Sequence, residues 1–283
     1  MRPDRALSLF FFRICGVGNF KKIPILMYHS VTETITQKVH PYYCTEISPE
    51  TFYCQLEILK KKGFSVVPLS ELPRIQKNHD NKKYVVITFD DGYEDFFKNA
   101  YPILKTFNMP ATVFIPAELI DKGKSLDGKR LMSWDQIREC STGSIEFGSH
   151  SLIHGKLIDM HRDQIRNELA VSKELIEKQL GTKINSFSFP YRFPEENPDF
   201  VVFLIKLLDS CGYSIAVTTI IGRVSNTDHH LLLKRLPVNE YDDEEFFMAK
   251  LAGAYDWLHS LQHLIKKARL LLKPKKNIED NIK

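Results

Sequence analysis

Short apolar runs alternate with longer segments of helical periodicity through most of the chain. This alternation predicts repeated β/α units and a mostly parallel sheet. The clearest strand covers residues 84–89, where only Thr88 interrupts the apolar run, as expected for a strand buried on both faces. The other predicted strands cover residues 23–28, 111–115, 145–148, 186–189, 213–218 and 231–236.

Helices are predicted between these strands. One begins at Ser48-Pro49, because serine is a good N-cap and proline is favoured at the first helical position. Phe52, Leu56 and Leu59 form its apolar stripe at helical spacing. Further helices are predicted at residues 95–107, 134–140 and 162–180.

The pattern changes near residues 239–244, and beyond them we expect one long helix. Its apolar stripe repeats at steps of four and three through Phe247, Leu251, Ala254, Leu258, Leu261, Ile265, Ala268 and Leu272. The stripe indicates either a helix packed against the rest of the protein or, because basic residues accompany it, a helix docked on an anionic membrane surface. Those basic residues are Lys266, Lys267, Arg269, Lys273, Lys275 and Lys276.

These patterns divide the chain into three parts. We expect an N-terminal segment (1–22), one α/β domain (23–238), and a C-terminal amphipathic helix with a basic tail (239–283). The N-terminal segment contains one apolar run at residues 6–12, ended by Arg13. That run fits a short helix lying on the protein or on a membrane, and it is also at the lower limit for a signal peptide, which leaves export open.

Composition narrows the possible classes of protein. With 283 residues and 43% hydrophobic residues the chain can build a large core. A formal net charge of +4 is too small to indicate nucleic-acid binding, so we expect no nucleic-acid partner. The five cysteines include no C-x-x-C pair, which argues against a disulfide framework and favours a reducing, cytoplasmic location. No apolar run reaches the about 18 residues of a membrane span.

Reactive side chains follow four of the predicted strands directly. They are His29, the pair Asp90-Asp91, His150, and the segment Pro190-Tyr191. Because the carboxyl ends of parallel strands form the active-site face of α/β sheets and barrels, one shared site is the better interpretation.

Two of these segments predict a metal site when they are taken together. Asp90-Asp91-Gly92 alone also fits a strand-end turn with a helix cap. His150 and His154, at i and i+4, alone fit two surface histidines, but on a helical turn they would project to one side. Two histidines and one carboxylate with open coordination positions are typical of a catalytic metal, which leaves the second carboxylate free as a base.

The same residues resemble the motifs of a known family. Residues 87–93 (Ile-Thr-Phe-Asp-Asp-Gly-Tyr), His150-Ser-x-x-His154 and Phe189-Pro190-Tyr191 are similar to successive motifs of the polysaccharide deacetylases. This is the NodB-like fold of carbohydrate esterase family 4. The resemblance covers residues 23–238 and implies a distorted (β/α) barrel holding one divalent metal. It implies that Asp90 is the base and that Asp91, His150 and His154 are the ligands. The backbone N–H of Tyr191, after Pro190, would help to hold the oxyanion.

Two departures from the family pattern are informative. The third motif often carries an arginine that orients the base, and here Ser188 precedes Phe189-Pro190 instead, so Arg192 or Arg235 would have to replace it. The late histidine acid is absent as well. Residues 24–29 (Pro-Ile-Leu-Met-Tyr-His) resemble instead the circularly permuted branch that includes poly-β-1,6-N-acetylglucosamine deacetylases, in which this histidine is the acid. The alternative is that His29 is structural and packs beside its neighbour in the chain.

We therefore expect a hydrolase that removes N-acetyl groups from an amino-sugar polysaccharide or a glycan intermediate. Zinc suits the ligand set best, although nickel, cobalt, iron or manganese would also fit. Two alternatives stay open: O-deacetylation on the same metal, and a catalytically inactive relative that binds carbohydrate.

Overall fold

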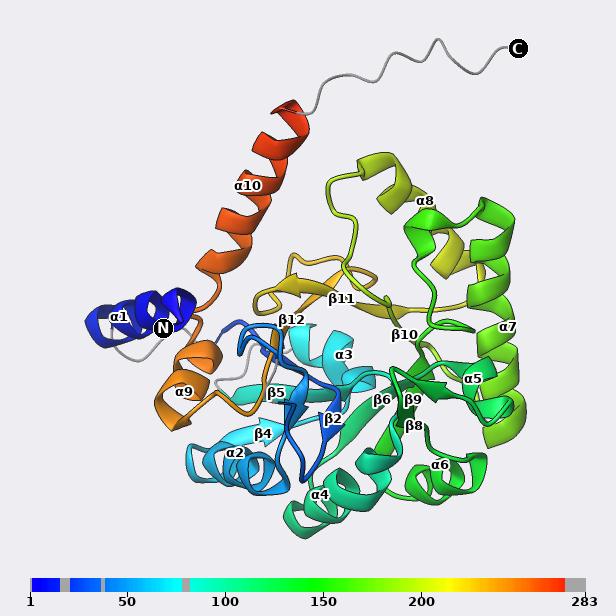
Figure 1. Cartoon of the computed structure of the whole chain (residues 1–283), viewed down its shortest axis with the longest axis horizontal. Coiled ribbons are helices and arrows are strands. Elements are labelled where there is room, and N and C mark those ends of the chain that lie inside the picture. The colour runs from blue at the N-terminus through cyan, green and yellow to red at the C-terminus, as the bar shows by residue number, and fades with distance from the viewer. Residues whose placement is uncertain (1, 16–20, 37–38, 78–81, 273–283) are drawn as a thin grey trace.

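The computed structural model of the chain describes residues 2–15, 21–36, 39–77 and 82–272 (Figure 1). Seven parallel strands close into a barrel in the order β1-β12-β11-β10-β9-β6-β5, and β5 pairs back to β1. A further strand, β4 (Phe64–Val66), pairs with β5 outside this ring. The barrel strands are β1 (Ile25–Tyr28), β5 (Lys83–Phe89), β6 (Ala111–Ile115), β9 (Ile145–Ser149), β10 (Ser186–Ser188), β11 (Ile215–Ile221) and β12 (Leu233–Pro237). The predicted (β/α) barrel is confirmed.

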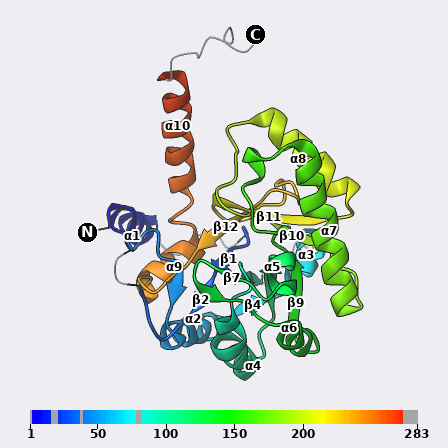
Figure 2. The same cartoon turned by 45° about the vertical axis from the view of Figure 1, so that its right-hand side comes forward.

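Helices surround the barrel (Figures 1 and 2). They are α2 (Pro49–Lys61), α3 (Leu72–Lys77), α4 (Tyr101–Phe107), α5 (Ala117–Asp121), α6 (Trp134–Ser141), α7 (Arg162–Leu180) and α8 (Pro198–Ser210). Short 3-10 turns occur at Leu69–Glu71 (η1) and Leu157–Asp159 (η3), and a π-helical turn at Phe96–Ala100 (η2) leads into α4. Two small sheets flank the barrel: β2 (Ser30–Val31) with β3 (Glu46–Ile47), and β7 (Ser125–Leu126) with β8 (Lys129–Arg130).

Local signals in the sequence explain where several helices begin and end. Ser48 caps α2 by accepting a hydrogen bond from the Thr51 N–H, as its N-cap position predicts. Gly181 ends α7 in the left-handed region at φ 68°, where glycine carries no steric penalty. The seven predicted strands are all present, with boundaries displaced by up to three residues.

The barrel interior has an apolar end and a polar end. Val86 of β5 and Phe114 of β6 pack in one buried cluster with Ile215 of β11, a strand that is a neighbour of neither β5 nor β6 in the ring. Such contacts are possible only inside a barrel. Side chains alternate along each strand, so Thr88 follows Val86 on the same face of β5, one layer nearer the carboxyl end. Polar groups therefore gather at the carboxyl ends of the strands.

The prediction of one long C-terminal helix is wrong. The segment forms α9 (Glu244–Ala252) and α10 (Trp257–Leu272), separated at Gly253. Gly253 has φ 93°, and a Cβ at this position would lie 1.7 Å from Nη2 of Arg223, so both backbone conformation and space require glycine. The Arg223 guanidinium packs against this break, and its Nε donates to Asp256 Oδ2 at 3.1 Å.

The break also divides the predicted apolar stripe. Phe247 and Leu251 on α9 are buried, as is Leu258 on α10, whereas Leu261 is 43% exposed. The stripe residues Ile265, Ala268 and Leu272 lie beyond the side chains that the structure describes. The helix α10 extends away from the barrel in both views (Figures 1 and 2).

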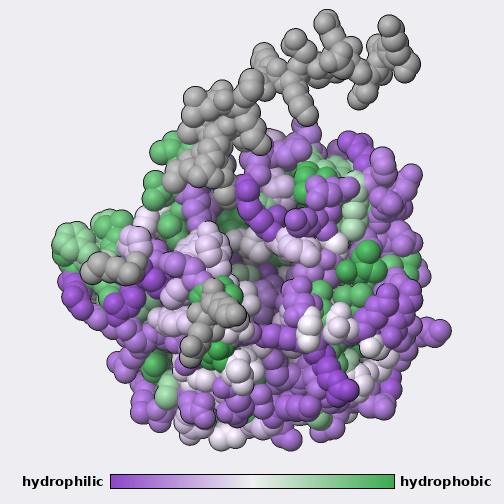
Figure 3. Space-filling model, viewed as in Figure 1, coloured by the Kyte–Doolittle hydropathy of each residue, from purple (hydrophilic) through white to green (hydrophobic). Residues whose placement is uncertain are grey.

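The N-terminal segment forms helix α1 (Pro3–Cys15), which packs against α9. Arg13 pairs with Glu245 at 2.8 Å, and the Tyr255 hydroxyl donates to Asp4 at 2.9 Å. The outer face of α1 is apolar (Figure 3), and Leu7, Phe10, Phe11 and Ile14 are exposed on it. The prediction of a short helix lying on the protein is confirmed. Among the described helices, none is long and apolar enough to cross a bilayer.

Candidate active site at the carboxyl ends of the strands

The structure brings the predicted strand-end residues together. His29 follows β1, the aspartate pair follows β5, and His150 follows β9. The backbone N–H of Asp90 donates to the Tyr28 carbonyl at 3.0 Å, which fixes the base candidate beside the end of β1. The pairing of β1 with β5 in the closed ring is what places His29 close to Asp90, 61 positions away in the sequence.

Asp90 is buried and forms a bidentate ion pair with Arg235. Arg235 Nη1 lies 2.8 Å from Asp90 Oδ1, and Nη2 lies 2.7 Å from Oδ2. Ser188 Oγ adds a third hydrogen bond to this carboxylate at 3.1 Å. Burial opposes ionisation, but the nearby guanidinium lowers the pKa of Asp90 below its ordinary value. Asp90 is therefore held as an oriented carboxylate at neutral pH.

Arg235 itself is fixed by the interior of the barrel. Its side chain is buried, Nε donates to the Thr218 carbonyl at 3.0 Å, and Nη1 lies 3.3 Å from Thr88 Oγ1. The other arginine considered, Arg192, is exposed and pairs with Glu196 instead. Of the two arginines left open by the sequence, the structure places Arg235 on the base candidate and keeps Arg192 away from it.

Asp91, His150 and His154 form the three-residue cluster of potential metal ligands within the described residues. Asp91 Oδ1 lies 3.3 Å from His150 Nε2 and 3.2 Å from His154 Nε2, and all three residues are buried. In a tetrahedral zinc site with bonds of about 2.0–2.1 Å, neighbouring ligand atoms are about 3.3 Å apart. The two aspartate–histidine distances match that spacing.

The hydrogen bonds around the cluster also fit a cation. His150 Nδ1 lies 2.8 Å from the Ser188 carbonyl, so this nitrogen carries the proton and Nε2 is left as a ligand. Asp91 Oδ1 and His154 Nδ1 are buried and make no hydrogen bond within the described part of the chain. An unsatisfied buried carboxylate oxygen is costly unless a cation or another donor occupies the space before it.

Asp91 owes its position to an unusual backbone conformation. Asp91 and Gly92 lie in the left-handed region, at φ 73° and 67°. The glycine is needed for space as well, because a Cβ on Gly92 would lie 2.7 Å from Cγ2 of Ile115. This turn directs the carboxylate of Asp91 toward the histidines, whereas the Asp90 carboxylate points to Arg235.

His150 and His154 do not lie on a helical turn, so that part of the prediction is wrong. Residues 150–156 form an irregular loop, with Ser151 at φ 66° and His154 at φ 56°. Glu168 of α7 holds the loop by accepting hydrogen bonds from the N–H groups of Leu152 and Ile153, at 2.8 and 3.1 Å. The loop brings the imidazole rings to a centroid distance of 4.9 Å. The left-handed residues at Asp91 and His154 are local strain of the kind found at functional sites.

His29 lies at the edge of this cluster. Its Nε2 is 4.0 Å from Asp90 Oδ2, and its side chain retains 20% of its exposure. Burial lowers the pKa of His29 below its ordinary value, and the two aspartates only partly oppose that shift. The structure thus places an imidazole next to the base candidate, on the open side of the site.

Pro190 and Tyr191 continue from β10 beside the ligands. Tyr191 has φ 58°, and its ring lies 4.8 Å from that of His154. Its amide N–H donates to no group within the described residues. The Tyr191 side chain is 47% exposed, and Lys156 Nζ lies 5.2 Å from the centre of its ring.

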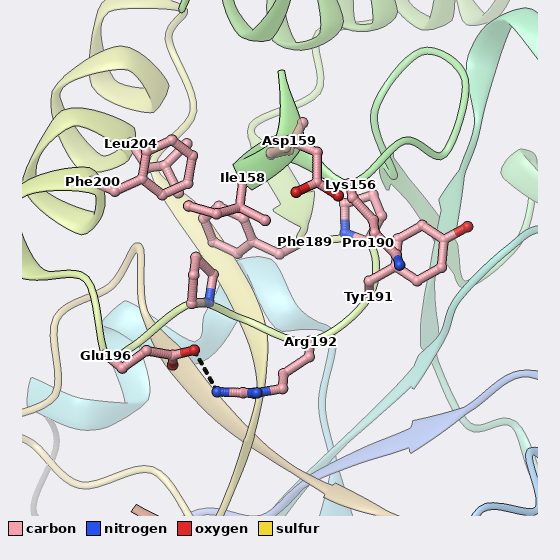
Figure 4. A pocket seen from close by; sticks show the side chains of 12 residues that line it. Lys156, Ile158, Asp159, Phe189, Pro190, Tyr191, Arg192, Glu196, Phe200 and Leu204 are labelled. Atoms are coloured by element: carbon pink, nitrogen blue, oxygen red, sulfur yellow. Dashed lines mark hydrogen bonds and ion pairs between the residues drawn. The ribbon is translucent and has the colours of Figure 1, made fainter. Parts of the chain in front are cut away.

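A cleft of about 280 Å³ is lined by Tyr191 together with residues of the following loop and of α8 (Figure 4). Its lining combines apolar side chains with a charged rim: Phe189, Pro190, Phe200 and Leu204 with Lys156, Asp159, Arg192 and Glu196. Such a mixture suits a polar ligand with apolar faces, such as a sugar ring.

Several residues of the site were not anticipated from the sequence. Ser188 contributes both its hydroxyl, to Asp90, and its carbonyl, to His150. It was noted only as standing in place of the usual arginine. Thr88 and Glu168 were not singled out as site residues. Their roles depend on contacts between elements that are far apart in the sequence, which no local pattern reveals.

Comparison with known proteins identifies the class of protein. The family model for polysaccharide deacetylases matches residues 77–213. YxkH of Bacillus subtilis, whose name also assigns it to the polysaccharide deacetylases, is 30% identical over 221 residues, or 77% of this chain and 72% of YxkH. This chain belongs to the polysaccharide deacetylase family, a class of hydrolases. The resemblance stated from the motifs is confirmed.

The names of some further relatives also state a substrate. The poly-β-1,6-N-acetyl-D-glucosamine N-deacetylase of Staphylococcus aureus is 28% identical over 155 residues. The match covers 51% of this chain and 53% of that protein, so the chain spans about half the length of this relative. Among solved structures, the Streptococcus pyogenes deacetylase PplD in complex with acetate has a TM-score of 0.71 and 26% identity, covering 81% of this chain and 98% of PplD. IcaB from Ammonifex degensii has a TM-score of 0.69 and 24% identity, and the match covers 82% of this chain and 97% of IcaB.

Proposed function

We propose that this chain is a divalent-metal-dependent hydrolase that removes N-acetyl groups from an amino-sugar polymer. One observation carries the proposal: three buried ligand groups converge beside a separate buried carboxylate that Arg235 keeps ionised and oriented. This arrangement provides a cation site and a base without using one aspartate for both. The proposed ligands are Asp91, His150 and His154, and the proposed base is Asp90.

The side chains divide the reaction between them. Asp91, His150 and His154 would hold a divalent ion, which would supply Lewis acidity toward the acetyl carbonyl. Asp90 accepts a proton from the attacking water, because its carboxylate is ionised and is not a ligand. The amide N–H of Tyr191 can donate to the oxyanion that forms on the carbonyl oxygen. His29, on the open side, donates a proton to the departing amine, and the C–N bond breaks to give acetate and a free amino sugar.

The substrate class follows from the relatives and from the cleft. Relatives are named for action on poly-β-1,6-N-acetyl-D-glucosamine, and we propose an N-acetylated glycan of this kind. The exposed ring of Tyr191 and the apolar floor of the cleft offer surfaces on which sugar rings can pack. The charged rim supplies hydrogen-bonding groups for hydroxyls.

Zinc is the proposed metal, because two imidazoles and one carboxylate in an open site are typical of catalytic zinc. Nickel, cobalt, iron and manganese accept the same ligands. Burial opposes protonation of His150, but Asp90 and Asp91 raise the pKa of this imidazole above its ordinary value. A cation must displace that proton, so metal affinity should decrease as the pH falls.

Acetate release from a panel of N-acetylated and O-acetylated oligosaccharides, with and without chelator, tests the proposal. We expect release from N-acetylglucosamine oligomers, loss after chelation, and recovery on adding zinc. Release from O-acetyl sugars alone would favour the O-deacetylase. An inactive carbohydrate-binding relative would bind the oligomers and release no acetate with any metal. The missing motif arginine is the reason for that last alternative, and the ion pair between Arg235 and Asp90 argues against it.

A further inference from the structure

Two histidines of α10 and a glutamate beside the cleft form a looser group of metal-binding residue types than Asp91, His150 and His154 do. His259 and His263 lie one turn apart on α10, and both face Glu195. His259 Nε2 lies 3.5 Å from Glu195 Oε2, and His263 Nδ1 lies 3.7 Å from the same oxygen. None of these three residues belongs to the active site described above.

The chemistry of this cluster resembles that of the first one. The distances from Glu195 Oε2 to the two imidazole nitrogens are 3.5 and 3.7 Å. Both are close to the separation of about 3.3 Å between neighbouring ligand atoms in a tetrahedral zinc site. His263 Nδ1 is buried and makes no hydrogen bond within the described residues. The ring centroids of the two histidines are 5.9 Å apart, so the rings must turn toward Glu195 to close the set. Their exposed fractions of 25% and 34% leave room for that rotation and for entry of an ion.

The backbone that carries Glu195 is held in place. Glu195 lies in a turn closed by the hydrogen bond from the Asn197 N–H to the Pro194 carbonyl, at 3.0 Å. Asn197 also caps α8 through the Phe200 N–H. The histidines are spaced i and i+4 on a helix, the spacing that lets two imidazoles chelate one ion. Only side chains have to move for binding.

We propose that Glu195, His259 and His263 form a second site, which binds a divalent transition metal of the zinc class. Two nitrogen ligands and one carboxylate favour zinc, copper or nickel over calcium or magnesium, which prefer all-oxygen sites. The ion joins α10 to the turn at residues 194–197. Because Pro194 and Glu196 line the cleft, an ion at this site also fixes the cleft wall beyond Tyr191.

The test measures zinc content by elemental analysis after equilibration with Zn²⁺ and removal of the excess. In a chain with His150→Ala and His154→Ala, which disables the active-site cluster, we expect about one zinc per chain to remain. Adding His259→Ala and His263→Ala should remove it. The matched control is His229→Ala with His230→Ala, which removes two exposed histidines elsewhere and should leave the zinc in place.

A second measurement uses fewer substitutions, so that it can be made even if the variant with four replaced histidines folds poorly. In the otherwise intact chain, His259→Ala with His263→Ala should lower the zinc content by about one equivalent, and Zn²⁺ should no longer slow amide hydrogen exchange in α10. The proposal is overturned if the active-site variant binds no zinc, or if zinc content is unchanged when His259 and His263 are replaced. Zinc-independent pairing of protonated histidines with Glu195 would give the first of these results. The proposal does not depend on the proposed function, since the active-site ligands are absent from the main test.

Discussion

Asp90 and Asp91 are adjacent in the sequence, yet they face different partners. Asp90 pairs with Arg235, and Asp91 faces the two histidines. The left-handed conformation of Asp91 separates the two carboxylates, and burial makes each of them depend on its own counter-charge. At the scale of single residues, this separation allows one carboxylate to hold a metal while the other takes a proton.

Replacing Arg235 should change the pH dependence of the reaction. The guanidinium lowers the pKa of Asp90, so Arg235→Gln should raise that pKa. Asp90 must be ionised to act as a base, and activity is lost as pH falls through its pKa. The acidic limb of the kcat/KM profile should therefore move up by about one to three pH units. Arg235→Lys, which keeps the charge, should move it less. An unmoved acidic limb in Arg235→Gln would show that this arginine does not act on the base.

His29→Ala tests the proposed acid. A general acid must be protonated, and burial lowers the pKa of His29, so wild-type amide hydrolysis should decline as pH rises through that pKa. The variant should keep its metal, lose about 10²–10⁴-fold in kcat on amides, and lose this alkaline limb. Esters should be affected less, because an alkoxide leaves more readily than an unprotonated amine. If the alkaline limb and the amide rate both persist, His29 is structural.

At the scale of elements, the loop at residues 150–156 shows why the sequence predicted which residues are the ligands but not the backbone conformation that brings them together. The i and i+4 spacing of His150 and His154 suggested a helical turn. The chain instead uses left-handed residues and the buried Glu168 of α7 to bring the rings together. Glu168 follows the loop by more than ten positions on a separate helix, so its role is visible only in three dimensions.

Replacing Glu168 should therefore weaken metal binding. Glu168→Ala leaves the buried N–H of Leu152 without an acceptor, at a cost of about 1–3 kcal/mol, and also removes the acceptor of the partly buried Ile153 N–H. Metal affinity should fall about 10–100-fold, as is typical when support for a ligand is removed. Glu168→Gln retains an acceptor oxygen, so its metal affinity should fall less. Metal titration measures both variants, and wild-type affinity in Glu168→Ala would contradict this role for Glu168.

The helices after residue 239 show that an apolar repeat alone does not predict where a helix ends. The apolar repeat continues through Gly253, yet α9 ends there. Gly253 is in the left-handed conformation, and the guanidinium of Arg223, thirty positions earlier, occupies the space of a side chain. The barrel strands, in contrast, are predicted correctly from the sequence, because a strand buried on both faces is a continuous apolar run. β2, β3, β7 and β8, with two residues each, are too short to leave such a signal.

At the scale of the whole molecule, closure of the barrel assembles the site. Local patterns predicted strands whose ends carry reactive groups, and the parallel topology placed those ends on one face. The choice between Arg192 and Arg235 depended on which strands are neighbours across the ring, which the sequence of one chain does not specify. The same closure leaves α1 and α10 outside the barrel, linked where Trp257 donates to Ser8 at 3.0 Å.

Exposed apolar residues on α1 and α10 lead us to retain the proposal of contact with an anionic membrane. Phe10, Ile14 and Leu264 are all more than half exposed, and basic residues follow in the sequence of α10. The chain should sediment with anionic vesicles and less with neutral ones. Phe10→Ser with Ile14→Ser should reduce binding, while Val202→Ser, an exposed apolar residue of α8, should not. Equal binding to both vesicle types, or none, would contradict the proposal.

The most direct test of the account compares Asp90→Asn with Asp91→Asn, measuring metal content and acetate release on the same samples. His259→Ala and His263→Ala are included in each, so that only the active-site cluster is measured. Asp90→Asn should keep its metal and lose about 10²–10⁴-fold in kcat on N-acetylglucosamine oligomers, the contribution of a positioned base. Asp91→Asn should lose both metal and activity. Metal loss in Asp90→Asn, or normal turnover in either variant, would contradict the assignment of base and ligand.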